Sequence, residues 1–250
     1  MTTARLNKNH PQSTDFSGEG VLSAELNLLE NSISVFDVNM RKKLKECFWF
    51  AAQKHNAQYY TWLNHKRFPY IFHISNVARN TFCFQKNHLL TIIAFWHDLI
   101  EDERCTESEL IEKIECLELA DDKELIIIAL RNLNRKNFTY SKDYYHVVCS
   151  DNYSLVVKSA DILANLNACL IRFDEMQNDG TIHWIYDYLF EVENFLFVNI
   201  DFINNENSLI IKKKLMEIIL LIDAKFSVSE KNEFIKFCEE RKNGKNQRIK

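Results

Sequence analysis

The sequence predicts an all-α protein. Of its 250 residues only four are Gly and two are Pro, too few for the dense turns of a β-rich fold. Apolar residues recur instead with the period of amphipathic helices over most of the chain. We find no internal repeat, low-complexity block or alternation of strands and turns in the sequence. Helices therefore account for the expected secondary structure.

The first half of the chain begins with a polar stretch and continues with predicted helices. Residues 1–20 are polar and are expected to form a loose leader. Helical periodicity begins near Val21 and returns strongly over 38–56. Pro69 can occupy the first turn of the next helix, where its missing N–H costs nothing, and that helix carries His73.

The second half of the chain shows two helix-start signals and several further helical patterns. Thr106 and Glu109 have the spacing of a capping box and predict a helix over 107–118. Residues 227–230, Ser-Val-Ser-Glu, are typical of another cap. The remaining helical patterns lie near 121–134, 141–149, 153–172, 182–203 and 208–224.

Composition and charge argue against a nucleic-acid-binding, membrane-spanning or disulfide-bonded protein. The net charge of −4 gives no electrostatic signature of nucleic-acid binding. The apolar runs are far shorter than the roughly 20 residues of a membrane span, and the first residues do not resemble a signal peptide. The seven Cys are odd in number and show no CxxC spacing, which favours reduced thiols over disulfides or a zinc finger. We therefore expect a cytoplasmic protein that binds neither nucleic acid nor a membrane, and the sequence carries no signal for an oligomeric state.

The pair His97-Asp98 stands in a segment where charged residues are rare. From Leu89 to Ile100 the sequence is apolar on nearly every helical face, which indicates a buried helix. A buried carboxylate is strongly destabilising unless it is paired or bound to a metal. The adjacent imidazole suggests that a divalent cation compensates Asp98.

Two acidic residues extend this pair. His97 and Glu101 are four residues apart and would share a helix face, and so would Asp98 and Asp102. Negative charge at a helix C-terminus opposes the helix dipole. The position of Glu101 and Asp102 therefore suggests a partner outside the helix, as an alternative to a solvated helix end.

Two further segments provide polar residues in apolar surroundings. His73 lies on a mostly apolar helix, where a lone His is more often a core residue than a metal ligand. A polar stripe on the helical pattern of 153–172 fits equally well a solvent-exposed face or a site for a metal and an anionic ligand. Its members are Lys158, Asp161, Asn165 and Arg172.

Together these segments provide a ligand set for one divalent metal: His73, His97, Asp98 and Asp161. Imidazole and carboxylate ligands suit Mn, Fe, Zn or Co, and several carboxylate oxygens favour Mn. Such a metal lowers the pKa of a bound water and stabilises negative charge on a phosphoryl group. Glu101 would then orient or deprotonate the water. The candidate phosphate partners are the cations Lys66, Arg67, Lys158 and Arg172.

The order of these motifs resembles the HD-domain metal-dependent phosphohydrolases, and most closely the small alarmone hydrolases of the RelA/SpoT type. The resemblance covers roughly residues 45–172. A weaker similarity includes Leu133-Asn134-Arg135 and Tyr144-Tyr145. The stronger shared elements are Pro69-Tyr70-Ile71 before the first His, Val77-Ala78 after it, His97-Asp98-x-x-Glu101-Asp102, and Val157-Lys158-x-Ala160-Asp161-x-x-x-Asn165-Leu166.

The resemblance implies a helical bundle with a defined activity. It implies that the four ligands bind a metal, usually Mn, that Glu101 and Asp102 position and activate the attacking water, and that Asn165 helps to hold the nucleotide. The implied reaction removes the 3′-pyrophosphate of a guanosine alarmone, (p)ppGpp, and gives GDP or GTP and pyrophosphate. The expected organisation is a leader over 1–20, an HD phosphohydrolase domain over 21–180, C-terminal helices packed on the same core over 181–240, and a flexible basic tail over 241–250.

The sequence departs from the family pattern at positions that concern the substrate. Lys66-Arg67-Phe68 lacks the Gly that usually follows the basic pair, Ile74 replaces a Pro, and Ile162 and Ala164 replace an Arg and a His. None of these changes removes a predicted ligand. Two alternatives are therefore an HD-type phosphatase for another nucleotide and a non-catalytic module that senses nucleotides. A helical scaffold without a metal would leave Asp98 and Asp161 unexplained.

Overall fold

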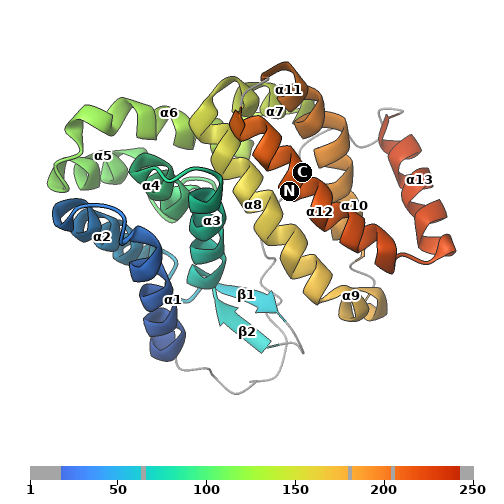
Figure 1. The fold of residues 1–250 in the computed structure, drawn as a ribbon, viewed down its shortest axis with the longest axis horizontal. Helices are drawn as coiled ribbons and strands as arrows, with labels where there is room; N and C mark the ends of the chain where they lie inside the picture. Colours follow the sequence, from blue (N-terminus) through green and yellow to red (C-terminus); the bar gives the residue numbers. More distant parts are fainter. Residues whose placement is uncertain (1–17, 63–65, 180–181, 204–205, 243–250) are drawn as a thin grey trace.

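The computed structural model confirms the all-α fold class. It describes residues 18–62, 66–179, 182–203 and 206–242, without the side chains of residues 18–23, 61–62, 66–67, 178–179 and 201–203. Most of the described residues lie in helices, which pack as a bundle (Figure 1). The strands among the described residues form one small antiparallel hairpin.

Helix α8 (Asn152–Ile171) runs through the middle of the bundle. It lies between α3 (Ile71–Phe84) and α12 (Glu206–Lys225), as Figure 1 shows. This central position makes α8 the element that joins the two halves of the molecule. The other helices that pack against it are α4 (His88–Trp96), α6 (Lys123–Leu133), α7 (Ser141–Ser150), α9 (Phe173–Asp179) and α10 (His183–Glu191).

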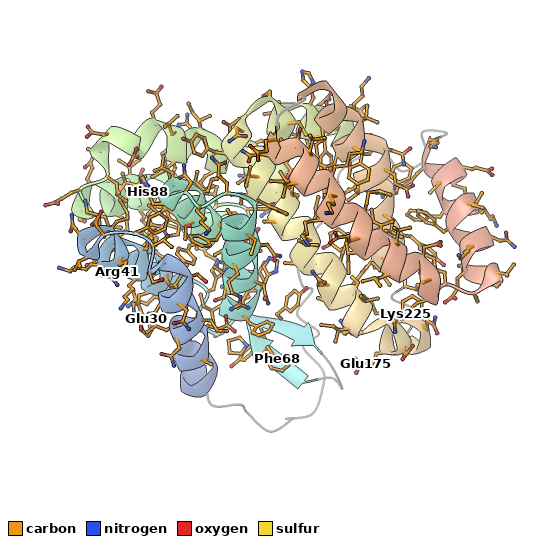
Figure 2. All side chains as sticks on the ribbon, in the orientation of Figure 1. Glu30, Arg41, Phe68, His88, Glu175 and Lys225 are labelled. Carbon is orange, nitrogen blue, oxygen red and sulfur yellow. The ribbon has the colours of Figure 1, made fainter. Side chains whose placement is uncertain are left out.

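Helices α1 (Gly18–Ile33) and α2 (Val38–Lys54) form one end of the bundle. The predicted helical segments near Val21 and over 38–56 are thereby confirmed. The side chain of Asp37 caps α2 by accepting a hydrogen bond from the backbone N–H of Met40 at 2.9 Å. Side chains fill the space between helices, whereas the labelled charged residues Glu30 and Lys225 are exposed (Figure 2).

The hairpin that precedes α3 was not predicted. Its strands are β1 (Tyr59–Trp62) and β2 (Lys66–Pro69), and Tyr59 pairs with Pro69. The expectation that Pro69 begins a helix is therefore wrong. Both strands of a two-stranded sheet are edge strands, where a residue without an N–H is tolerated. Tyr70 continues the pairing by donating its backbone N–H to Gln58 at 2.9 Å, and α3 begins at the next residue.

Helix α4 ends at Trp96, before the expected end of the helical segment at Ile100. One further α-turn follows, because the N–H of Asp102 donates to the carbonyl of Asp98 at 2.8 Å. Glu103 then adopts a left-handed conformation with φ 56°, which ends the helical path. The prediction of one continuous helix is thus wrong at its end, and the polar pair lies just beyond α4.

Both predicted caps are confirmed, and both predicted ends of the chain need a correction. Thr106 and Glu109 form a reciprocal capping box at the start of α5 (Glu107–Cys116). Ser227 and Glu230 exchange equivalent bonds at the start of α13 (Val228–Lys242). Helix α1 already includes residues 18–20 of the expected leader, and α13 includes 241–242 of the expected tail. Residues 1–17 and 243–250 lie outside the described part of the chain.

The predicted helix over 182–203 is interrupted by a wider turn. Helix α10 is followed by a π-helical turn (Val192–Leu196) and then by α11 (Phe197–Ile203). Short helix α9 was not predicted, since its sequence is polar apart from the buried Phe173 and Met176. Two 3-10 turns, Ala120–Asp122 and Arg135–Asn137, flank α6.

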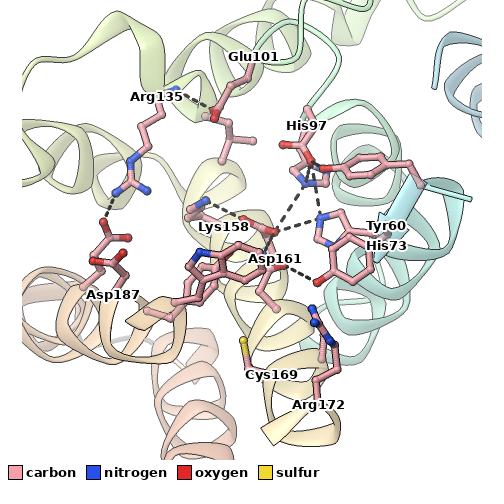
Figure 3. Close-up of a pocket in the computed structure, with 18 of the residues that line it drawn as sticks. Tyr60, His73, His97, Glu101, Arg135, Lys158, Asp161, Cys169, Arg172 and Asp187 are labelled. Carbon is pink, nitrogen blue, oxygen red and sulfur yellow. Dashed lines mark hydrogen bonds and ion pairs between the residues drawn. The ribbon is translucent and has the colours of Figure 1, made fainter. Parts of the chain in front are cut away.

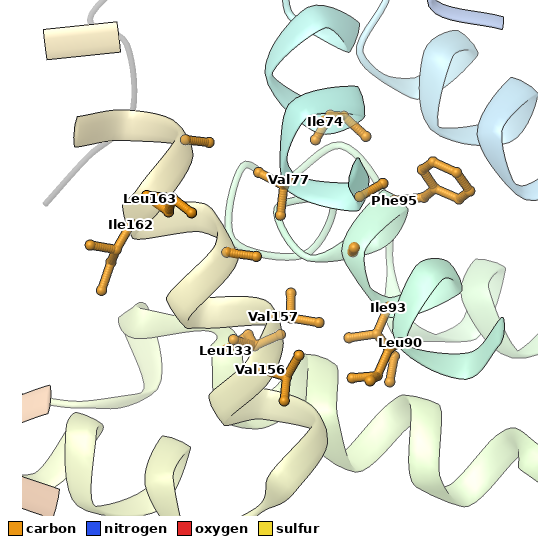
Figure 4. Close-up of a cluster of buried hydrophobic side chains, with 14 of the residues drawn as sticks. Ile74, Val77, Leu90, Ile93, Phe95, Leu133, Val156, Val157, Ile162 and Leu163 are labelled. Atoms are coloured by element: carbon orange, nitrogen blue, oxygen red, sulfur yellow. The ribbon is translucent and has the colours of Figure 1, made fainter. Parts of the chain in front are cut away.

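One apolar core extends from α1 to α12. Figure 4 shows the part between α8, α3 and α4, where Val157, Val77 and Leu90 meet. The predicted burial of the stretch around the His-Asp pair is confirmed, because Phe95 and Trp96 are completely buried. By length and composition α8 could cross a membrane, but 72% of its apolar window is buried inside the protein, as expected of a central core helix.

Candidate metal centre

Three helices bring the four predicted metal ligands together. His73 lies in the first turn of α3, His97 and Asp98 follow α4, and Asp161 lies in the middle of α8. His73 Nε2 is 3.3 Å from Asp161 Oδ1 and 3.6 Å from Asp98 Oδ2, and His97 Nε2 is 3.0 Å from Asp98 Oδ2. Ligand atoms of His73, His97 and Asp98 all lie within 4.8 Å of one another. The cluster is seen in Figure 3.

The tautomer and burial of His97 suit a metal ligand. Its Nδ1 is 2.8 Å from the carbonyl of Ala94, so this nitrogen carries the proton and donates it. Its Nε2 is buried and makes no hydrogen bond with any residue that the structure describes, although Asp98 is near. With Nδ1 as the donor, Nε2 next to the Asp98 carboxylate either carries a second proton or directs its lone pair at a cation. Coordination of a cation shared with Asp98 would satisfy both side chains.

Opposite charges in the cluster stabilise one another. Burial alone would raise the pKa of Asp98, but the neighbouring His97 and His73 outweigh burial and hold that pKa well below its usual range. Burial would lower the pKa of His73, but Asp161 and Asp98 outweigh it and raise that pKa to about 9. The carboxylates are therefore ionised and attract positive charge, which either protons or a metal can provide.

Asp161 accepts hydrogen bonds from two polar side chains of its own helix, and Tyr60 supports one of them. Its Oδ2 accepts a hydrogen bond from Lys158 Nζ and its Oδ1 accepts one from Asn165 Nδ2, both at 2.7 Å. Tyr60 from β1 donates its hydroxyl to Asn165 Oδ1 at 3.1 Å and stacks on the His73 ring at 5.4 Å between centroids. Lys158 and Asn165 were predicted to contact the substrate. In the structure both line the pocket, and both position Asp161.

A second set of contacts holds the carboxylates of Asp98 and Asp102. The Tyr70 hydroxyl donates to Asp98 Oδ2 at 2.5 Å. Gln58 donates to Asp102 at 2.7 Å, and its amide oxygen is 2.8 Å from Nδ1 of His55. Burial and the adjacent Asp98 raise the pKa of Asp102 to about 6. Asp102, predicted to be catalytic, is absent from the described pocket wall and lies beside Gln58 instead.

Glu101 faces the pocket. One of its carboxylate oxygens accepts a hydrogen bond from the backbone N–H of Arg135 at 3.0 Å (Figure 3). The Arg135 side chain forms a buried ion pair with Glu191, whose other oxygen accepts the hydroxyl of Tyr145 at 3.0 Å. The backbone of Arg135 thus fixes Glu101, and the ion pair with Glu191 anchors the Arg135 side chain in the C-terminal helices.

The cluster lies in a cavity with about 1220 Å³ of free space, including the part that is open to solvent. Arg172 lines the cavity and lies 3.4 Å from Glu175. The side chains of Lys66 and Arg67, predicted phosphate partners, lie outside the described residues. The lining that is not charged consists of Tyr60, Tyr70, Leu133, Asn165, Ala168, Cys169, Met176, Trp184 and Tyr188.

Sequence reasoning missed the residues that hold the ligands in place. His55, Gln58 and Glu191 carry no local signal, because their partners are distant in the chain. Tyr70 could have been found, since it stands inside the Pro-Tyr-Ile element shared with the family. Arg135 could have been found in the same way from the weaker Leu-Asn-Arg similarity.

Comparison with known proteins adds no assignment. No family model matches the chain, and no curated protein matches it. The choice of a function therefore depends on the residues of the site and their geometry.

Proposed function

We propose that this protein is a metal-dependent phosphohydrolase of the HD type that acts on a phosphorylated guanosine nucleotide. The observation that carries the proposal is the convergence of His73, His97, Asp98 and Asp161, with a buried His97 nitrogen that makes no hydrogen bond to a described residue. Glu101 lines the same cavity, where its carboxylate could contact a water molecule beside the ligands.

The proposed chemistry divides between the metal and the chain. A bound divalent ion, for which Mn²⁺ suits the ligand set best and Fe, Zn or Co are possible, would lower the pKa of a water and stabilise charge on the phosphoryl group. Glu101 accepts the proton of that water or orients it. The Arg135 N–H keeps one Glu101 oxygen occupied and so fixes the direction of the other. Tyr70 and Asn165 hold the two ligand carboxylates.

The first proposed reaction is removal of the 3′-pyrophosphate of (p)ppGpp. A second candidate is a phosphatase for a nucleotide with fewer phosphates, and the charges of the cavity favour it. Each cation that lines the described wall has an acidic neighbour: Arg135 has Glu191, Lys158 has Asp161, and Arg172 has Glu175. A polyphosphate substrate requires several cations to balance its charge, whereas a single phosphate on the metal requires few.

A nucleotide panel with Mn²⁺ tests the proposal. Release of pyrophosphate from guanosine 3′-pyrophosphates supports the first reaction, and release of phosphate from simple nucleotides supports the second. No release from any member of the panel by metal-loaded protein would reject hydrolysis and favour the sensor alternative.

Two variants separate the metal from the chemistry. Asp98→Ala should lose both stoichiometric metal and turnover, because it removes a ligand that contacts both imidazoles. Glu101→Gln should keep the metal and lose about 100-fold or more in kcat, the usual effect of a general base. A Glu101→Gln protein with full activity would contradict the role of Glu101.

A further inference from the structure

Helix α10 presents two aromatic side chains to the cavity of the metal centre. Trp184 and Tyr188 are four residues apart, so they share one face of α10, and both line the cavity. Met176 from α9 and Cys169 from α8 line it as well. Asp161 lines the same cavity, so this aromatic wall and the candidate metal ligands face one space.

The polar atoms of these two rings are available to a ligand. Neither the indole N–H of Trp184 nor the hydroxyl of Tyr188 makes a hydrogen bond with a residue of the described chain. The other tyrosines near the site use their hydroxyls: Tyr60, Tyr70, Tyr144 and Tyr145 each donate to a protein oxygen. Because Trp184 is exposed and Tyr188 is only partly buried, water can satisfy both donors in the free protein. A ligand in the cavity that carries hydrogen-bond acceptors can replace that water.

The exposure of Trp184 supports the same conclusion. Its side chain is 39% exposed, although the following residues Ile185 and Tyr186 are completely buried. A large aromatic ring kept open at the rim of a cavity offers a stacking surface rather than core packing. Each cation of the described wall has an acidic neighbour, so this wall favours an uncharged ring as the stacking group.

We propose that Trp184 and Tyr188 form the subsite for the planar base of the substrate, a purine nucleobase stacked on Trp184 with the phosphate directed to the metal ligands. The subsite belongs to the C-terminal helices and is separate from the Lys66-Arg67 segment that the family resemblance points to. The identity of the ligand as a nucleoside rests on the proposed function, whereas the stacking surface does not.

Calorimetric titration with guanosine tests the subsite on the full chain. Guanosine carries no phosphate, so its binding requires neither the metal nor hydrolysis. Stacking of one base on an aromatic ring contributes enough that Trp184→Leu should weaken binding by about 5- to 150-fold, and Trp184→Phe, which keeps a ring, should weaken it less. Trp49→Ala is the matched control: Trp49 on α2 has the same 39% exposure and does not line the cavity, so this variant should bind like the wild type.

The outcomes distinguish this proposal from the proposed function. A wild-type protein that binds guanosine no better than ribose, or a Trp184→Leu protein that binds guanosine like the wild type, overturns the subsite. Loss of binding in Trp184→Leu with retention in Trp184→Phe supports it, even if no nucleotide in the panel is hydrolysed. If the wild type hydrolyses nucleotides but Trp184→Leu binds guanosine unchanged, the proposed function stands and the subsite is rejected.

Discussion

The buried ion pair between Arg135 and Glu191 gives a sharp test of how the C-terminal helices support the site. Both side chains are only 7% exposed. Glu191 also accepts the Tyr145 hydroxyl, and the Arg135 guanidinium lies 5.1 Å from the centre of the Tyr144 ring. We expect Glu191→Leu to leave the Arg135 charge buried among these rings without its ion-pair partner.

The expected loss is large because the pair is buried. Removing one partner of a buried pair costs about 3–5 kcal/mol, whereas an exposed pair contributes about 0–1 kcal/mol. A domain has about 5–15 kcal/mol of total stability, so Glu191→Leu should remove a third or more of a typical value. The double variant Arg135→Met/Glu191→Leu should recover most of the loss, since an apolar pair of similar volume removes both charges.

Urea unfolding of the wild type, the single variant and the double variant measures these free energies. Glu217→Leu is the matched control, because its pair with Lys214 is about half exposed on α12, and it should change the free energy of unfolding far less. A Glu191→Leu protein that loses less than about 1 kcal/mol, or a double variant no more stable than the single, would refute the reasoning.

Three further outcomes are expected. Burial lowers the pKa of His55 from 6.5 to about 4, so between these pH values the unfolded chain binds a proton that the folded protein does not. The free energy of unfolding should therefore fall as the pH drops from about 6.5 to 4, and His55→Gln should reduce this fall by about 3 kcal/mol in urea unfolding. An unchanged pH dependence in His55→Gln would contradict this expectation. Tyr70→Phe removes the donor to Asp98 and should weaken Mn²⁺ affinity by about 10- to 100-fold in a metal titration, and unaltered affinity would show that the bond is dispensable. Chelation of the metal-loaded protein should lower its Tm and re-addition of Mn²⁺ should restore it, with no such shift in Asp98→Ala.

The sequence predicted the helices and the residues that converge in the cluster because both depend on local patterns. Apolar periodicity identified most helical segments, and the box of Thr106 and Glu109 located a helix start to the residue. His73 and Asp161 stand on helices that are apolar on most faces and His97 directly follows one, so burial directs them inward. Once α3 and α4 pack on α8, these side chains have to meet.

The predictions were wrong where one sequence pattern is compatible with two kinds of secondary structure. A Pro without an N–H fits both the first turn of a helix and an edge strand, and Pro69 took the second. No Gly marks the end of the helical turn that follows α4. Glu103 adopts the left-handed conformation there in place of a Gly. The apolar Leu99 and Ile100 therefore prolonged the predicted helix beyond its real end.

The polar stripe of α8 shows why substrate contacts are harder to predict than a cluster of buried polar side chains. Lys158 and Asn165 lie three and four residues from Asp161, and these are also the spacings of neighbours on one helix. The same spacing that marked them as candidates for the substrate thus makes them partners of Asp161. A cation that already neutralises a ligand carboxylate contributes little to binding a second anion. Selection among substrates then has to come from elsewhere in the cavity, and the ring of Trp184 on α10 offers the open surface for it.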